Sequence, residues 1–265
     1  MCKINRVLLI ILLVVSVCSL ANAGDTPDSK KDSSPDPSAT KDWEFSLAPF
    51  YFWAVNLDGD ATVRGTTAPI NLDFDEIFDT LEGLFTVHFE AWYRQKWGLL
   101  IDVSYINISD QQTTPGPTLD VDFENVITEL GFFYRFFDKG PHQLEALAGI
   151  RYTDLDVEID VVGVPLNTNG NQDWLDPMIG ARYNWQISEK WHLSLRGDIG
   201  GFGIGDASDF TWNAVGLINW QPWKHVGFLG GYRAMNQDYE TGSGLNKFAY
   251  DVLMQGPVLA VKFTW

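Results

Sequence analysis

Apolar and polar residues alternate one by one over most of the chain from residue 43 onward. Aromatic residues, leucine and proline occupy the odd positions from Trp43 to Trp53, and Glu44, Ser46 and Ala48 lie between the first of them. The same period of two runs through residues 99–105 and 191–199. A side chain that changes face at every residue is the pattern of a β-strand. The chain beyond residue 42 is therefore predicted to be all-β.

Two kinds of connection separate these runs, and short and long ones alternate along the chain. The short ones lie at residues 95–98, 138–141, 188–190 and 222–225, and the long, polar ones near residues 57–83, 109–118, 163–171, 203–208 and 240–246. Short turns at one end and long loops at the other are typical of outer-membrane barrels, whose short turns face the periplasm. We therefore predict a transmembrane antiparallel up-and-down β-barrel.

Ten membrane-spanning strands are predicted, and twelve or eight are the alternatives. The ten runs are residues 43–56, 84–95, 98–108, 119–137, 142–162, 172–187, 191–202, 209–220, 226–239 and 248–265. An even number of strands brings both ends of the barrel to the periplasm. Residues 57–83 would break that parity as one more spanning strand. We interpret them as a short hairpin followed by one or two helical turns over residues 74–81.

Residues 1–23 have the layout of a secretory signal peptide. Lys3 and Arg6 precede an apolar run over residues 7–20, and small residues before Gly24 form a cleavage site. The run is shorter than the roughly 20 residues that a membrane-spanning helix needs. A lipoprotein anchored through Cys18 is an alternative, although a small residue is expected where Val17 stands.

Residues 24–42 are polar and rich in proline and serine, which predicts a disordered periplasmic leader before a barrel over residues 43–265. Both cysteines of the chain would leave with the signal peptide, so no disulfide and no thiolate metal site is expected. The chain carries 18 basic and 35 acidic residues, a net charge of −17, which excludes a nucleic-acid partner. Eleven tryptophans fit the aromatic girdles that barrels carry at both membrane surfaces.

The last eight residues are predicted to form a final strand, and the last of them is aromatic. Leu259, Val261, Phe263 and Trp265 share one face. This pattern resembles the C-terminal signal by which outer-membrane proteins reach the barrel-assembly machinery. That machinery, the outer-membrane lipids and lipopolysaccharide are the expected partners.

The chain resembles a family of small Gram-negative outer-membrane β-barrel proteins of the porin-like superfamily. The resemblance covers nearly all of residues 43–265, and it is carried by Phe45–Trp53, Gly149–Val157, Ser194–Gly203, Gly231–Arg233 and Tyr250–Pro257. It implies a barrel fold and an outer-membrane location. It implies no activity and supplies no catalytic residues.

Arginines and carboxylates share the polar face of the predicted strands. A cation that faces lipid at mid-membrane costs about 2–4 kcal/mol, so this face is assigned to the lumen. The turn at Gly140 pairs Arg135 with Glu145 and Glu129 with Arg151, and opposite charges in register stabilise a sheet. The predicted lumen network comprises Glu90, Arg94, Glu129, Arg135, Glu145, Arg151, Arg182, Arg196, Asp198 and Arg233.

Two interpretations of this network remain open. The ion pairs satisfy the charges of a lumen that side chains fill, since buried charges need partners. Alternatively, the arginines form a constriction that selects anionic solutes. Ten strands leave little free lumen, because about eight are just filled by side chains.

The same register places carboxylates opposite one another on the outer face of two strands. The predicted acidic ladder comprises Asp120, Asp122, Glu124, Asp156, Glu158 and Asp160. It lies beyond one membrane crossing from the turn, so it faces water or lipopolysaccharide. Three interpretations are open: a solvated extension of the barrel, a bulge that restores the original facing, or a binding site for Ca²⁺ or Mg²⁺, which prefer carboxylate oxygens. No other cofactor is expected.

The function predicted best is that of a structural barrel or a passive small-solute channel with a narrow or closed pore. The alternative is a lipid- or peptide-modifying enzyme centred on His88. Glu90 shares a face with His88, and a turn near Trp97 is expected to place Ser104 opposite Glu90. A serine, a histidine and a carboxylate are the parts of an activated nucleophile. Polar residues are what any lumen contains, so no catalytic residue is assigned.

Overall fold

The computed structural model describes residues 42–74, 81–113, 118–161 and 167–265. The predicted signal peptide, nearly all of the predicted leader and most of the predicted helical segment at 74–81 lie outside these residues. Among the described residues, no helix has the length and hydropathy of a membrane span. Apart from one short 3-10 helix, η1 (Gly244–Asn246), the described elements are strands, as the alternation predicts.

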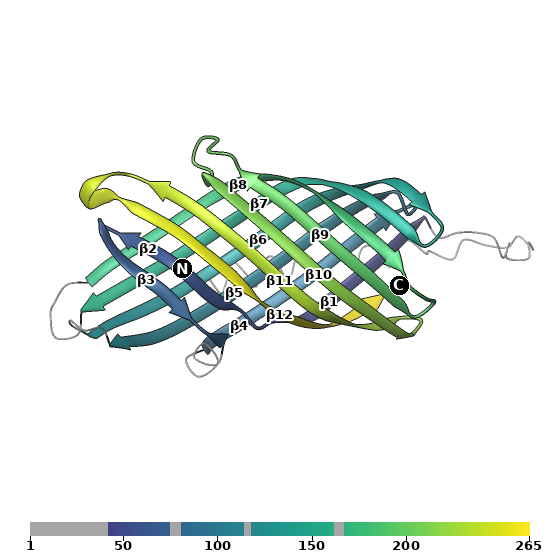
Figure 1. Cartoon of the computed structure of the whole chain (residues 1–265), viewed down its shortest axis with the longest axis horizontal. Helices are drawn as coiled ribbons and strands as arrows, with labels where there is room; N and C mark the ends of the chain where they lie inside the picture. The colour runs from purple at the N-terminus through teal and green to yellow at the C-terminus, as the bar shows by residue number, and fades with distance from the viewer. Residues whose placement is uncertain (1–41, 75–80, 114–117, 162–166) are drawn as a thin grey trace, which may run out of the picture. The chain divides into compact units, whose positions relative to one another are not determined.

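Twelve strands form one antiparallel sheet (Figure 1). They are β1 (Trp43–Trp53), β2 (Asn56–Val63), β3 (Thr66–Leu72), β4 (Leu81–Tyr93), β5 (Trp97–Thr113), β6 (Thr118–Lys139), β7 (His142–Val161), β8 (Asn167–Gln186), β9 (Trp191–Gly201), β10 (Phe210–Trp223), β11 (Val226–Thr241) and β12 (Phe248–Thr264). Ten of them, β1 and β4 to β12, pair in order, and β1 pairs with β12 to close a barrel. The prediction of ten barrel strands is confirmed, and the alternatives of twelve and eight are not needed.

The remaining two strands form the hairpin predicted between residues 57 and 83. β2 continues the line of β1, because β12 pairs with β1 over Val258–Thr264 and with β2 over Phe248–Gln255. β3 then folds back on β2. Gly256 faces the bend between β1 and β2, where the carbonyl oxygen of Ala54 would lie only 1.7 Å from a Cβ at this position. A residue without a side chain therefore lets β12 pass this bend.

The outer face carries the apolar surface that lipid requires. Isoleucine, leucine and phenylalanine side chains are exposed along the middle of the wall, for example Ile150, Ile179 and Ile218. Exposed aromatic residues gather beside the short turns, which we call the turn end of the barrel, as the predicted inner girdle requires. They include Trp43, Trp97, Tyr134, Trp185, Trp191, Trp223 and Phe263.

The inner face changes character along the barrel axis. In β7, the inward side chains are charged at Glu145 and Arg151 and apolar at Leu155 and Val157, and all four are buried. The same alternation runs through the strand without a break, so no bulge restores the facing. Toward the long loops, which we call the loop end, buried apolar side chains from β1, β2, β3, β5, β6, β7, β8, β11 and β12 form one contiguous cluster.

Candidate functional site

The lumen is crossed at mid-height by a network of arginines and carboxylates. Five arginines take part, namely Arg135, Arg151, Arg182, Arg196 and Arg233. Each extends inward from a strand of the wall, and several reach partners on the opposite side. Arg233 on β11 contacts Asp102 on β5, and Arg182 on β8 contacts Glu90 on β4. These transverse contacts follow from the inward parity that the sequence predicts.

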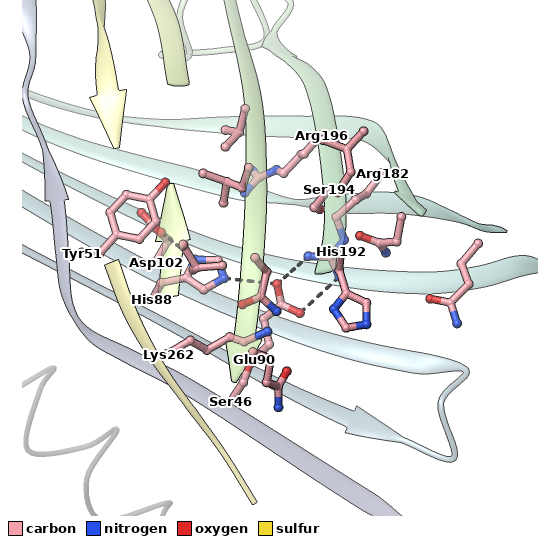
Figure 2. A pocket seen from close by; sticks show the side chains of 18 of the residues that line it. Ser46, Tyr51, His88, Glu90, Asp102, Arg182, His192, Ser194, Arg196 and Lys262 are labelled. Atoms are coloured by element: carbon pink, nitrogen blue, oxygen red, sulfur yellow. Dashed lines mark hydrogen bonds and ion pairs between the residues drawn. The ribbon is translucent and has the colours of Figure 1, made fainter. Parts of the chain in front are cut away.

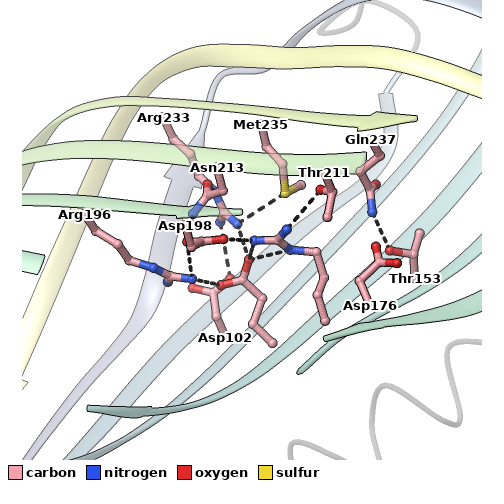
Figure 3. Close-up of polar contacts among 12 residues, drawn as sticks. Asp102, Thr153, Asp176, Arg196, Asp198, Thr211, Asn213, Arg233, Met235 and Gln237 are labelled. Atoms are coloured by element: carbon pink, nitrogen blue, oxygen red, sulfur yellow. Dashed lines mark hydrogen bonds and ion pairs between the residues drawn. The ribbon is translucent and has the colours of Figure 1, made fainter. Parts of the chain in front are cut away.

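Glu129 is the centre of the network, whose members Arg196, Asp198 and Arg233 are labelled in Figure 3. Its carboxylate oxygens form ion pairs with the guanidinium nitrogens of Arg151 at 2.8 Å, Arg196 at 2.7 Å and Arg233 at 3.2 Å. Asp198 closes the cluster, because Arg151 and Arg196 lie 2.6 and 2.9 Å from its two oxygens. Glu129 and Arg151 have no exposed side-chain surface. Charges removed from water this completely are stable only when each has several partners.

A second group of charges lies closer to the turn end. Glu145 accepts from Arg135 at 2.9 Å and from Arg182 at 2.7 Å. Arg182 also donates to Glu90 at 2.5 Å. Both pairs predicted from the turn at Gly140, Arg135–Glu145 and Glu129–Arg151, occur in the predicted register.

His88 joins the two groups (Figure 2). Its Nε2 lies 3.1 Å from Glu90 of the turn-end group, and its Nδ1 lies 2.9 Å from Asp102 of the central group. A carboxylate only accepts hydrogen bonds, so both ring nitrogens donate when both carboxylates are ionised. Asp102 was missing from the predicted network. It lies on the polar side of the run at residues 99–105, and this parity could have identified it.

Aromatic rings support the arginines from the sides. The guanidinium of Arg233 lies 4.7 Å from the ring centre of Trp53, and that of Arg182 lies 3.9 Å from Phe133. Arg135 lies 4.5 Å from the ring of Trp92. A planar guanidinium can stack on a ring and still donate at its edge. These contacts fix the arginines in the plane of the network.

Arg94 does not belong to the network, and the prediction for it is wrong. β4 ends at Tyr93, and Arg94 lies in the tight turn to β5, where its φ is positive at 51°. Its side chain is 65% exposed and pairs with Asp42 at 2.9 Å. The hydrogen bond to Asp42 raises the pKa of Arg94 above its ordinary value. The strand was predicted two residues too long, so the parity rule was applied beyond its end.

The Ser–His arrangement considered for an enzyme does not form. The tight turn pairs Tyr93 with Trp97, which places Leu100, not Ser104, opposite Glu90. The Ser104 hydroxyl instead lies 3.4 Å from that of Thr86. With both ring nitrogens held by carboxylates, His88 has no free position from which to accept a proton from a nucleophile.

A cavity of about 300 Å³ lies between the network and the turn end. Its inner wall includes His88, Glu90 and Arg233, and its outer wall includes Glu44 and Gln95, which are exposed. Lys262 on β12 also lines it and was missing from the predicted lumen residues (Figure 2). This lysine lies opposite the face of Leu259, Val261 and Phe263, so the C-terminal alternation could have placed it there.

The acidic ladder has the predicted backbone register. Asp120 pairs with Asp160, Asp122 with Glu158 and Glu124 with Asp156. Asp156 accepts a hydrogen bond from Asn171 at 3.2 Å. Among the described residues, no group of three or more histidine, cysteine or acidic side chains has the geometry of a metal site. The divalent cation therefore stays a prediction.

Comparison with known proteins gives a fold and no close relative. The chain matches no protein-family model and no curated protein sequence. The structure of the outer membrane protease OmpT of Escherichia coli superimposes with a TM-score of 0.53, at 8% identity, over 86% of this chain and 98% of that one. The transport unit of the autotransporter AIDA-I of Escherichia coli matches 94% of this chain and 96% of its own, at 10% identity and a TM-score of 0.44. The chain therefore has the closed ten-stranded barrel fold of the outer-membrane β-barrel proteins.

Proposed function

We propose that the protein is a structural barrel of the Gram-negative outer membrane whose lumen does not conduct solutes. It is exported by a cleaved signal peptide, and both ends of the barrel lie in the periplasm. The turn end then faces the periplasm, and the loop end with its acidic outer face projects from the cell.

The observation that supports a closed lumen is that two different layers of side chains lie one after the other along the barrel axis. The Arg–carboxylate network spans the middle, and the apolar cluster lies across the lumen toward the loop end. Within that cluster Trp174 of β8 stacks on Tyr239 of β11, with ring centres 4.2 Å apart. An ion would have to break the first layer and enter the second without water, which is costly at each step.

The network also argues against the arginine constriction. A constriction that selects anions needs cations that face the passing solute. Here Arg151 is fully buried between Glu129 and Asp198, and Arg182 lies between Glu90 and Glu145. Carboxylates satisfy these arginines, so they support the wall.

Single-channel recording of the refolded protein in planar bilayers tests this proposal. Heat-dependent gel migration and a β-rich circular dichroism spectrum establish that the sample is folded. We expect no steady conductance. Glu129→Gln should also be silent, because the apolar layer remains when the ionic layer is weakened. Steady, ion-selective steps from the folded wild-type protein would overturn the proposal.

A further inference from the structure

The cavity at the turn end has a charge opposite to that of the whole protein. Five cationic side chains line it, namely Arg135, Arg182, Arg196, Arg233 and Lys262, against three acidic ones, Glu44, Glu90 and Asp102. The chain as a whole carries a net charge of −17. The carboxylates that neutralise the arginines from behind, such as Glu129 and Glu145, are not part of the cavity wall. The cavity wall therefore carries more cationic than acidic side chains.

Lys262 is a cation of this wall without a carboxylate partner. Within the described ranges its ammonium group forms no ion pair with a carboxylate, although Glu44 and Glu90 line the same cavity. Arg196 contributes a second free donor, since its Nε is buried without a hydrogen-bond partner while its side chain is only 9% exposed. Unmet donors of this kind in a concave site are positioned for an acceptor from outside the protein.

Neutral polar side chains complete the wall. They are Ser46, Gln95, Gln143, Asn184, Ser194, Asn219 and Gln221. Within the described part of the chain, the side chains of Ser46, Gln143, Asn184 and Ser194 form no hydrogen bond to another side chain, so they are available to a ligand. Hydroxyl and amide groups both donate and accept, which suits the hydroxyls of a sugar or polyol.

We propose that this cavity binds a small hydroxylated anion, of the class of sugar phosphates and sugar acids. Lys262 holds the acidic group, and the amide and hydroxyl side chains hold the hydroxyls. A volume of about 300 Å³ is at the lower end of the range of ligand pockets and suits a single sugar ring with its acidic group. The ligand enters from the turn end, because the network closes the other side.

The proposal goes beyond the closed barrel and is tested separately from it, by binding and not by conductance. Glucose 6-phosphate is titrated into the folded protein in a zwitterionic detergent by calorimetry, with glucose and inorganic phosphate as the component ligands. We expect the sugar phosphate to bind at least tenfold more tightly than either component, and more weakly as salt rises. Equal affinity for phosphate and the sugar phosphate would overturn the role of the polar side chains.

Lys262→Met should lower the affinity for glucose 6-phosphate at least tenfold. The matched control is Lys224→Met in a turn outside the cavity, which should bind as the wild type does. Ser194→Asp leaves Lys262 in place and should also abolish binding, because it adds a negative charge to the wall. If folded Lys262→Met or Ser194→Asp binds as tightly as the wild type, the proposed site is wrong.

Discussion

At the scale of single residues, His88 decides whether the lumen holds a catalytic group or a structural one. The ring sits between Asp102 and Glu90, and through them it connects the central and the turn-end charges. The hydroxyl of Ser104, which would have to lie beside His88 to act as a nucleophile, lies instead next to that of Thr86. The geometry makes the histidine part of the support of the wall.

His88→Leu should therefore destabilise the barrel by about 2 kcal/mol or more, because two buried carboxylates lose a donor. Ser104→Ala is the matched control on the facing strand and should cost less than about 1 kcal/mol. Urea unfolding followed by tryptophan fluorescence measures both. Comparable losses for the two variants would contradict the structural role of His88.

Most lumen residues could be predicted from parity, and the errors came from chain geometry. The pairs Arg135–Glu145 and Glu129–Arg151 followed from one turn. Arg94 was misplaced because a strand end cannot be located to within two residues by alternation alone. Parity places Asp102 and Lys262 on the inner face, but their partners and the cavity across the lumen depend on how distant strands are arranged, which alternation does not show.

At the scale of elements, β12 holds the barrel closed along two different strands. It pairs first with β2 and then with β1, and the change of partner occurs at Gly256. The sequence predicted the ten strands and the hairpin. It could not show that the hairpin prolongs the first strand, because that arrangement depends on pairing between the two ends of the chain.

Gly256→Ala should cost about 3 kcal/mol and slow closure of the barrel, since the added methyl would overlap the Ala54 carbonyl oxygen. Gly197→Ala is the matched control, because a Cβ there meets open space. It should change stability by less than about 0.5 kcal/mol. Refolding rates and urea midpoints measure both effects, and a Gly256→Ala barrel that matches the control would show that the bend can move aside.

At the scale of the whole molecule, the barrel wall has two parts, which differ in the polarity of their inner and outer faces. Near the turns the outside of β6 and β7 is apolar and the inside charged, whereas toward the loops their outside carries carboxylates and their inside is apolar. The acidic ladder belongs to this second part. Like charges that face each other across a sheet are destabilising in water.

The double substitution Asp122→Asn and Glu124→Gln should raise the free energy of unfolding in chelator at low salt, by about 0.2–1 kcal/mol for each relieved pair, and the unfolding midpoint with it. The gain should shrink at high salt, where the repulsion is screened. Glu189→Gln at the turn end is the control and should have little effect. If millimolar Ca²⁺ raises the midpoint of the wild type alone, the predicted cation is supported, and a gain that salt does not change would contradict the repulsion.

The reversal of polarity along β6 and β7 also limits how deeply the barrel can enter a bilayer. The apolar outer band ends where carboxylates such as Asp122 and Glu158 begin, and the apolar interior lies above that line. A thicker bilayer cannot cover these charges cheaply, so it must thin around the protein, at a fraction of a kcal/mol per ångström. Beyond these carboxylates, the buried apolar cluster of the interior stabilises the fold without contact with lipid. In the proposed outer-membrane barrel, these carboxylates therefore mark the upper limit of the lipid-covered wall, and the part beyond them faces water.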